Sequence, residues 1–284
     1  RVKIRGAAVA AGELRPGMLM AMDSGIATGQ LQGEATKEPA FGLDAWWIDP
    51  PQRHRAESMN FTVVDTTSVL ATHITEIVKQ HAHELLTREE VNNLVETLRA
   101  KAPKLVEEAV PGLVKVADLQ RVLHNLLRER VPVRDMETIV ETLADWAPKT
   151  NDADILTEYV RNALRRSICE QYAVREADRP PRIVCVTLDP AFEDQIAAYV
   201  DRGPAGTSLT MPARVANQTA ERILRGVQRV TAAGHHPLII ASPQVRGVVR
   251  QILEPHLPTA VVLGYNEIPP GVEVESLGLV GATE

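Results

Sequence analysis

The first 66 residues alternate short apolar runs with turn-forming residues. Runs rich in β-branched, aromatic or apolar residues cover 2–4, 19–21, 45–48 and 61–64. Glycines and the pair Pro50-Pro51 separate these runs, and such residues mark turns between strands. The pattern predicts a small unit of short strands at the start of the chain.

From about residue 66 to residue 149 the apolar residues recur every three or four positions, which predicts helices. Thr87 followed by Glu90 forms a capping-box pattern, so one helix should end near Leu86 and the next should begin at once. We expect further helices on the apolar faces of 119–127 and 136–143, and one continuous helix with a basic outer face over 152–169.

The last hundred residues alternate predicted strands and helices. Strands are expected at 183–187, 238–241, 260–263 and 274–280, with a polar connector at 175–181 and a break at 203–206. Asp189-Pro190 and Ser242-Pro243 each offer an N-cap residue followed by proline, which favours a helix start. The whole pattern indicates an α+β chain with several domains and a helical middle.

Composition excludes several classes of protein and of site. The chain has 284 residues and a net charge of −6, so it lacks the basic excess of a general nucleic-acid binder. No apolar run is long enough to cross a bilayer. Cys169 and Cys185 alone support neither a disulfide framework nor a structural zinc site. The chain does not begin with methionine, and we expect it to be a piece of a longer protein.

Motifs for catalysis are missing as well. His81 and His83 are two residues apart, so on a helix they point in nearly opposite directions and cannot share one metal ion. Ser242 is not set in a nucleophile-elbow pattern. We therefore expect no catalytic residue, no metal and no cofactor. The alternative, an α/β enzyme, has only the alternation after residue 183 in its favour, and fold alone does not license function.

Long segments of the chain carry a family resemblance, and they occur in a fixed order. They include EPAFGLDAWWI (38–48), FTVVD (61–65), SVLATH (68–73), HAHELL (81–86), LQRVLHNLL (119–127), VPVRDM (131–136), LTEYVR (156–161) and VLGYNEI (262–268). Together they resemble the cytoplasmic domain of the type III secretion export gate family, most closely its flagellar branch. The injectisome branch of the same family is the alternative.

The resemblance implies an organisation and a role. It implies four small subdomains: a mixed α/β one at 1–66 completed by 111–130, a helical one inserted at 67–110, a ring-building one at 131–208 and a mixed one at 209–284. It implies a membrane portion N-terminal to this region, at the cytoplasmic face of the bacterial inner membrane, and a homo-nonameric ring. The implied role is non-enzymatic: docking flagellar export chaperones with their substrates, alongside other components of the export apparatus.

The resemblance also implies a chaperone-docking site, a hydrophobic dimple between the first two subdomains. By the surrounding motifs, Leu86 stands where the flagellar family has its key aromatic residue, His83 at a partly polar position, and Ala117 where a threonine is usual. Val110 and Val114 would line the same wall. Leu86 still offers apolar area to an inserted helix but lacks an aromatic face, and Ala117 lacks the hydroxyl group.

Charged residues of 131–168 are candidates for the ring contact. A cyclic ring joins two different patches on neighbouring subunits. We expect Arg161 and Arg165 to contribute to one patch, together with Arg134 and Arg166. The acidic patch would carry Glu137, Glu141 and Asp145.

Overall fold

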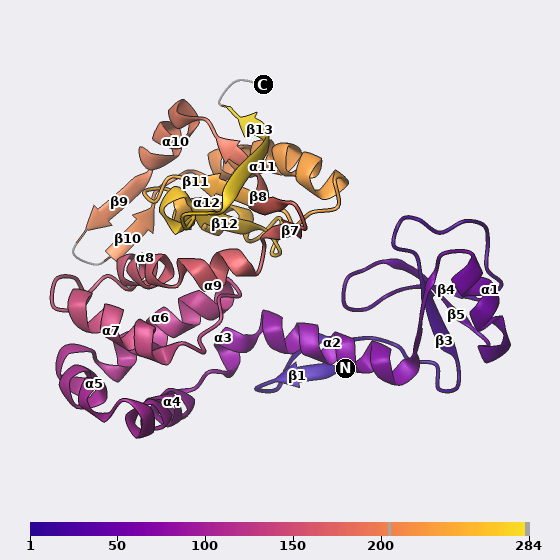
Figure 1. The fold of residues 1–284 in the computed structure, drawn as a ribbon, viewed down its shortest axis with the longest axis horizontal. Helices are drawn as coiled ribbons and strands as arrows, with labels where there is room; N and C mark the ends of the chain where they lie inside the picture. Colours follow the sequence, from indigo (N-terminus) through magenta and orange to yellow (C-terminus); the bar gives the residue numbers. More distant parts are fainter. Residues whose placement is uncertain (204–205, 282–284) are drawn as a thin grey trace. The chain divides into compact units, whose positions relative to one another are not determined.

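The computed structural model describes residues 1–203 and 206–281, and the chain forms two compact units, Arg1–Leu85 and Leu86–Glu284 (Figure 1). Each unit is built on a β-sheet and several helices. Pro204 and Ala205, in the break expected at 203–206, lie outside the described residues. Within the described residues, no helix is both long enough and apolar enough to cross a membrane.

The first unit is an antiparallel sheet with helices beside it. Its four-stranded sheet has the order β4-β5-β3-β6, and a separate hairpin joins β1 to β2. The strands are β1 (Val2–Ile4), β2 (Ala7–Ala10), β3 (Leu19–Met22), β4 (Glu34–Lys37), β5 (Asp44–Ile48) and β6 (Thr62–Asp65). Its helices are α1 (Arg53–Ser58), α2 (Thr66–Gln80) and α3 (Ala82–Leu85). The four strands predicted here from the sequence are confirmed.

Both faces of this sheet are covered. Because consecutive side chains of a strand point to opposite faces, Met20 and Trp47 pack on one side with Val69 of α2. Ile48 packs on the other side with Phe61. The helix α2 is thus part of the first unit. The subdomain boundaries implied by the resemblance, including the helical subdomain at 67–110, stay a prediction.

Helices fill the first half of the second unit. They are α4 (Arg88–Lys101), α5 (Pro103–Glu108), α6 (Val116–Arg128), α7 (Met136–Trp146), α8 (Ala153–Ala163) and α9 (Arg165–Glu170), with a short helical segment at Ala109–Leu113. One hydrophobic cluster runs through them from Val91 to Leu263. The capping prediction at Thr87 is confirmed, because its side chain accepts a hydrogen bond from the Glu90 amide at 3.2 Å. The single helix predicted over 152–169 is wrong: it is divided at Leu164, whose ψ of 6° departs from helical values.

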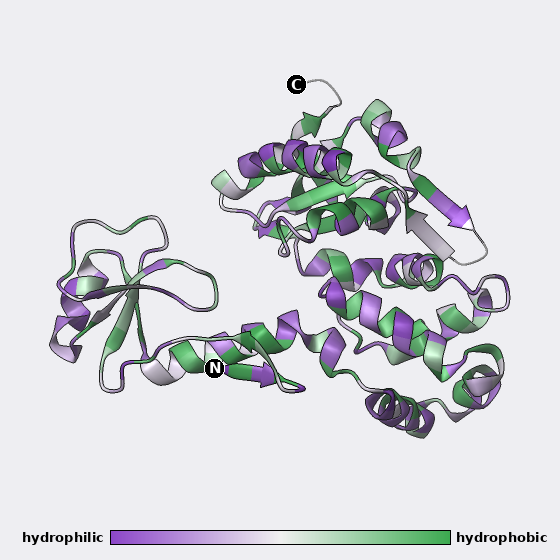
Figure 2. Cartoon of the chain, turned by 180° about the vertical axis from the view of Figure 1, so that it is seen from behind, coloured by the Kyte–Doolittle hydropathy of each residue, from purple (hydrophilic) through white to green (hydrophobic). Residues whose placement is uncertain are grey.

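A sheet forms the second half of this unit. Parallel strands lie in the order β12-β11-β8-β13, and β7 joins β8 in an antiparallel pair. The strands are β7 (Val174–Glu176), β8 (Arg179–Leu188), β11 (Leu238–Ala241), β12 (Val261–Gly264) and β13 (Glu273–Val280), with a hairpin of β9 (Val200–Gly203) and β10 (Gly206–Leu209). The helices are α10 (Pro190–Ala197), α11 (Ala213–Ala232) and α12 (Arg246–Leu253). In Figure 2 the central strands of this sheet are coloured as hydrophobic, the strand β9 as hydrophilic, and α11 carries residues of both kinds.

Two sequence expectations fail in this sheet. The predicted connector at 175–181 is instead the hairpin of β7 and β8, where Pro180 and Pro181 are tolerated because they lie at the exposed start of a strand. Ser242 does not cap a helix, since α12 begins three residues after Pro243 and Val245 precedes it. The Ser242 amide instead donates to Glu193 Oε1 at 2.7 Å. The cap at Asp189 is confirmed, because its carboxylate accepts from the Ala191 amide.

Candidate docking site

The backbone at Leu86 is fixed to helix α6. The Leu86 carbonyl oxygen accepts hydrogen bonds from Gln120 Nε2 at 3.2 Å and from His124 Nε2 at 2.8 Å. A carbonyl oxygen only accepts, so His124 carries a proton on Nε2. Arg88 Nε donates to Gln120 Oε1 at 2.9 Å and orients that amide. The segment leading into α4 is therefore held in one place by two side chains of α6.

The side chain of Leu86 lies partly at the surface and partly in the core. It is half-buried and packs on the hydrophobic cluster that includes Val110 and Val114. Val110 is 6% exposed and Val114 is 0% exposed, so Val114 supports this surface from beneath and offers no area to a partner. Ala117 is half-buried in the first turn of α6. Of the predicted site residues in the second unit, Leu86 and Ala117 present most of the accessible surface.

One exposed apolar residue of this region was missed by the sequence reasoning. Leu113 is 42% exposed on the segment that joins Val110 to Val114. The adjacent Pro111-Gly112 pair could have indicated the exposure of Leu113, because such pairs mark turns and loops outside regular secondary structure.

His83 belongs to the first unit and lies in α3. Its Nε2 is 3.9 Å from Glu84 Oε1, and His81 Nδ1 is closer to the same oxygen at 2.7 Å. The hydrogen bond from His81 lowers the pKa of Glu84. Arg5 also donates to the Glu84 carbonyl oxygen at 2.8 Å, which anchors α3 within its unit.

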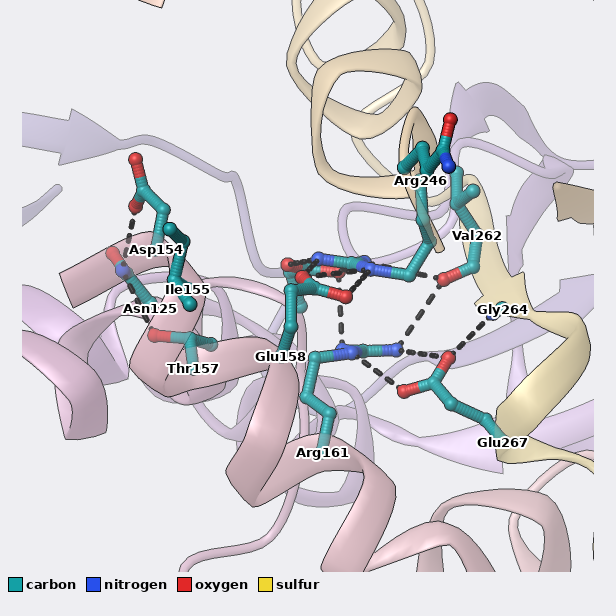
Figure 3. Close-up of polar contacts among 12 residues, drawn as sticks. Asn125, Asp154, Ile155, Thr157, Glu158, Arg161, Arg246, Val262, Gly264 and Glu267 are labelled. Carbon is teal, nitrogen blue, oxygen red and sulfur yellow. Dashed lines mark hydrogen bonds and ion pairs between the residues drawn. The ribbon is translucent and has the colours of Figure 1, made fainter. Parts of the chain in front are cut away.

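Arg161 does not lie on the basic outer face expected of it. Its side chain is 2% exposed and forms ion pairs with Glu129 at 3.1 Å and with Glu267 at 2.7 Å (Figure 3). The reason is visible in the spacing, since Arg161 lies four residues after the buried Thr157 and the two side chains therefore share one face of α8. That spacing was the missed signal. Arg165 is half-buried and donates to Asn162 Oδ1 at 3.4 Å, and Glu137, Glu141 and Asp145 are exposed.

Arg161 belongs to a buried charge network that connects the helices to the sheet. Arg246, at the start of α12, contacts Glu129 at 2.6 Å and also pairs with Glu158. Glu267 in turn accepts a hydrogen bond from the Gly264 amide at 2.6 Å (Figure 3). We call Glu129, Glu158, Arg161, Arg246 and Glu267 the buried network.

Glu129 is ionised within this network. Burial alone would raise the pKa of its carboxyl group, but the guanidinium groups of Arg161 and Arg246 outweigh burial and lower that pKa to about 2. Both arginines keep their charge. The ion pairs of the buried network therefore connect the end of α6 with α8 and α12.

The residues that the structure describes do not assemble a metal site, since no three His, Cys, Asp or Glu side chains among them gather around one point. Both thiols are buried and unpaired with each other. Burial raises the pKa of Cys169 to about 11 and that of Cys185 to about 12, so neither is a thiolate at neutral pH.

Comparison with known sequences decides the family. The FHIPEP family profile matches residues 1–273. The chain belongs to the FHIPEP family. It is 39% identical over 280 residues to the flagellar biosynthesis protein FlhA of Bacillus subtilis, covering 99% of this chain and 41% of that protein. It is 37% identical to FlhA of Caulobacter vibrioides, covering 98% and 39%. The chain thus spans about two fifths of the length of these curated relatives.

Solved structures of the same fold lie at lower identity. The Chlamydia pneumoniae CdsV protein matches with a TM-score of 0.81 at 24% identity, over 97% of this chain and 77% of that one. The nonameric EPEC SctV-C matches with a TM-score of 0.73 at 23% identity, over 92% and 78%. These matches confirm the predicted multi-domain α+β fold, and the FlhA matches confirm the resemblance to the flagellar branch.

Proposed function

We propose that this chain is the part of a flagellar type III export gate that docks export chaperones with their substrates and orders their export. The observation that carries the proposal is the match to FlhA proteins over nearly the whole chain. It is strengthened by a half-exposed leucine at the expected position, on a segment that α6 holds in place.

The flagellar system is favoured over the injectisome. The FlhA relatives named above are 37–39% identical to this chain, whereas CdsV and SctV-C are 23–24% identical. An enzymatic function has no comparable support, since the relatives are named as flagellar biosynthesis proteins.

The docking surface is built for an apolar anchor. Leu86 presents apolar area, and the fully buried Val114 belongs to the cluster on which it packs. An amphipathic chaperone helix places apolar residues at three- and four-residue intervals, and such a helix docks into apolar surfaces of this kind. Ala117 adds a small side chain that leaves room for close approach. For His83, which lies in the first unit, a contact with the chaperone stays a prediction.

Leu86→Ala is expected to weaken binding of a chaperone–substrate complex by about 1–3 kcal/mol, as loss of an interface anchor does. Leu86→Phe restores the aromatic face and is expected to tighten binding by about 0.5–1.5 kcal/mol. Isothermal titration calorimetry with a flagellar export chaperone from the same genome measures both changes.

Leu257→Ala is the matched control, because Leu257 is also half-buried but packs on the other hydrophobic cluster of the second unit. It should lower stability and leave the affinity unchanged. Equal affinities for folded Leu86→Ala and the unmodified chain would refute the docking role of Leu86.

We further propose that the full-length protein forms a homo-nonameric ring at the cytoplasmic face of the bacterial inner membrane, alongside other export components. Support comes from the neighbour SctV-C, whose structure is nonameric. With Arg161 buried, Arg165 is the proposed ring contact, facing the acidic residues Glu137, Glu141 and Asp145 of the next subunit.

Arg165→Glu is expected to abolish ring assembly and export in the full-length protein while leaving the fold intact. Exposed pairs contribute only about 0–1 kcal/mol each, but a closed ring repeats the contact at every interface. Native mass spectrometry or electron microscopy of the full-length protein counts the subunits. Arg175→Glu, a reversal at an exposed arginine outside this patch, serves as the control. Intact rings in the Arg165 variant would exclude this contact.

A further inference from the structure

The strand β13 lies at an edge of the sheet in the second unit. Among the described residues its hydrogen-bonded neighbour strand is β8 alone, so the other side of β13 carries backbone groups that no strand pairs. The register with β8 shifts between Ser276 and Leu279, and the Gly278 carbonyl oxygen accepts a hydrogen bond from Ser276 Oγ. Such an edge is a template for an added strand unless side chains block it. Val274 and Leu279, at 42% and 57% exposed, leave apolar surface along β13.

Arginines of α11 lie beside the C-terminal end of β13. Arg222, Arg225 and Arg229 line a cavity of about 50 Å³ with residues 278–281, and no acidic side chain lines it. The helix approaches β13 closely: a Cβ on Gly226 would lie 2.5 Å from Val280, and one on Gly278 would lie 2.8 Å from Arg229 Nη1. The guanidinium group of Arg229 therefore lies directly over the backbone of β13.

Two of these arginines have no partner of their own. Arg225 and Arg229 are exposed, and within residues 1–203 and 206–281 neither makes an ion pair or a side-chain hydrogen bond. The opposite end of β13 carries Glu273 and Glu275, of which Glu275 pairs with Arg182 at 2.6 Å. The edge is thus basic at its C-terminal end and acidic at its N-terminal end.

The spacing of the arginines matches that of an extended peptide. Residues four apart on a helix are separated by about 6 Å along its axis. Side chains two apart on one face of a strand are separated by about 6.8 Å. Two acidic residues separated by one residue would therefore meet Arg225 and Arg229 together.

We propose that the free edge of β13, with Arg225 and Arg229, binds an extended acidic segment of a partner protein as an added antiparallel strand. Backbone hydrogen bonds to β13 supply affinity. The arginines select a peptide whose acidic residues lie in its N-terminal half, and Glu273 favours a basic residue near its C-terminal end. A nucleic acid is disfavoured because the chain carries a net charge of −6. This surface is separate from the docking surface at Leu86.

A capped, fluorescein-labelled peptide, Asp-Val-Asp-Val-Thr-Val-Lys-Val, is the probe, and fluorescence polarisation with the whole chain is the measurement. We expect Arg225→Glu combined with Arg229→Glu to lower the affinity about tenfold or more, because each attraction becomes a repulsion. Arg214→Glu is the matched control, since it reverses an exposed arginine of the same helix away from the cavity. It should change the affinity by less than about twofold, within the usual range of a distant surface substitution.

Backbone pairing is tested separately from charge. Two further peptides are used, each N-methylated at every second amide, so that one carries methyl groups on the amides that face β13 and the other on the amides that face away. The first peptide should lose binding, and the second should retain it.

The proposal would be overturned by no binding of the probe at about 1 mM, by equal binding of both N-methylated peptides, or by equal loss in the Arg214 control. Displacement of the probe by octathymidine at comparable concentration would point to a nucleic-acid surface and would also refute it. Thermal melting of each variant confirms that the fold is kept.

Discussion

Replacing Arg246 with alanine is expected to lower the free energy of unfolding by about 3–5 kcal/mol. Arg246 is 2% exposed, and its guanidinium group contacts both Glu129 and Glu158. Removing it leaves the Glu129 carboxylate, 13% exposed, with Arg161 as its remaining close partner. Desolvation of an uncompensated charge is costly, so the loss exceeds that of one hydrogen bond.

Urea unfolding monitored by circular dichroism measures this loss, with Arg175→Ala as the control. Arg175 and Glu170 also form an ion pair, but both side chains are 62% exposed, so water replaces the contact and little stability should be lost. If the two variants lose the same stability, the buried network does not stabilise the second unit in the way described.

The second large effect is the pH dependence of this stabilisation. The folded-state pKa of Glu129 is about 2, below its ordinary value of 4.5, because the two arginines favour the carboxylate. A group with a depressed pKa stabilises the fold above its unfolded pKa and loses that contribution as pH falls toward the folded pKa. The contribution should therefore be complete above about pH 5 and should fade between about pH 4.5 and pH 2. The shift corresponds to roughly 3 kcal/mol.

Glu129→Gln isolates this contribution, because glutamine keeps the shape but cannot ionise. The difference in unfolding free energy between the two proteins should be largest near neutral pH and should shrink steadily below pH 4.5, the ordinary value for this group. A difference that stays constant down to pH 2.5, where the folded-state pKa of about 2 is nearly reached, would show that the Glu129 charge does not contribute.

Local signals predicted most of the elements. The caps at Thr87 and Asp189 depend on one side chain and an amide two or three residues away, so the sequence alone defines them. Within the predicted strand 183–187, residues 183–186 are a continuous buried apolar run, which is typical of a parallel sheet with covered faces. These features need no information about distant parts of the chain.

The misses depend on tertiary contacts. Pro180 and Pro181 look like a connector until β7 is seen to pair with that stretch. The spacing of Arg161 from Thr157 could have indicated a buried position, but its ion-pair partners Glu129 and Glu267 are distant in sequence and only the fold brings them to it. For the candidate site, the sequence predicted which positions are apolar but not how deeply each side chain is buried. Val114 is buried because α6 and its neighbours cover it, whereas Leu86 remains half-exposed.

The central claim is that chaperone–substrate complexes dock at the surface around Leu86 and Ala117, and site-specific photo-crosslinking tests it most directly. A photoreactive benzoylphenylalanine is placed at Ala117, half-buried in the first turn of α6, and at Ser167, exposed in α9, as the control. The account predicts a crosslink to the chaperone from position 117, lost when Leu86 is changed to alanine, and none from position 167. Equal crosslinking from both positions, or none from position 117 under conditions where the complex forms, would contradict it.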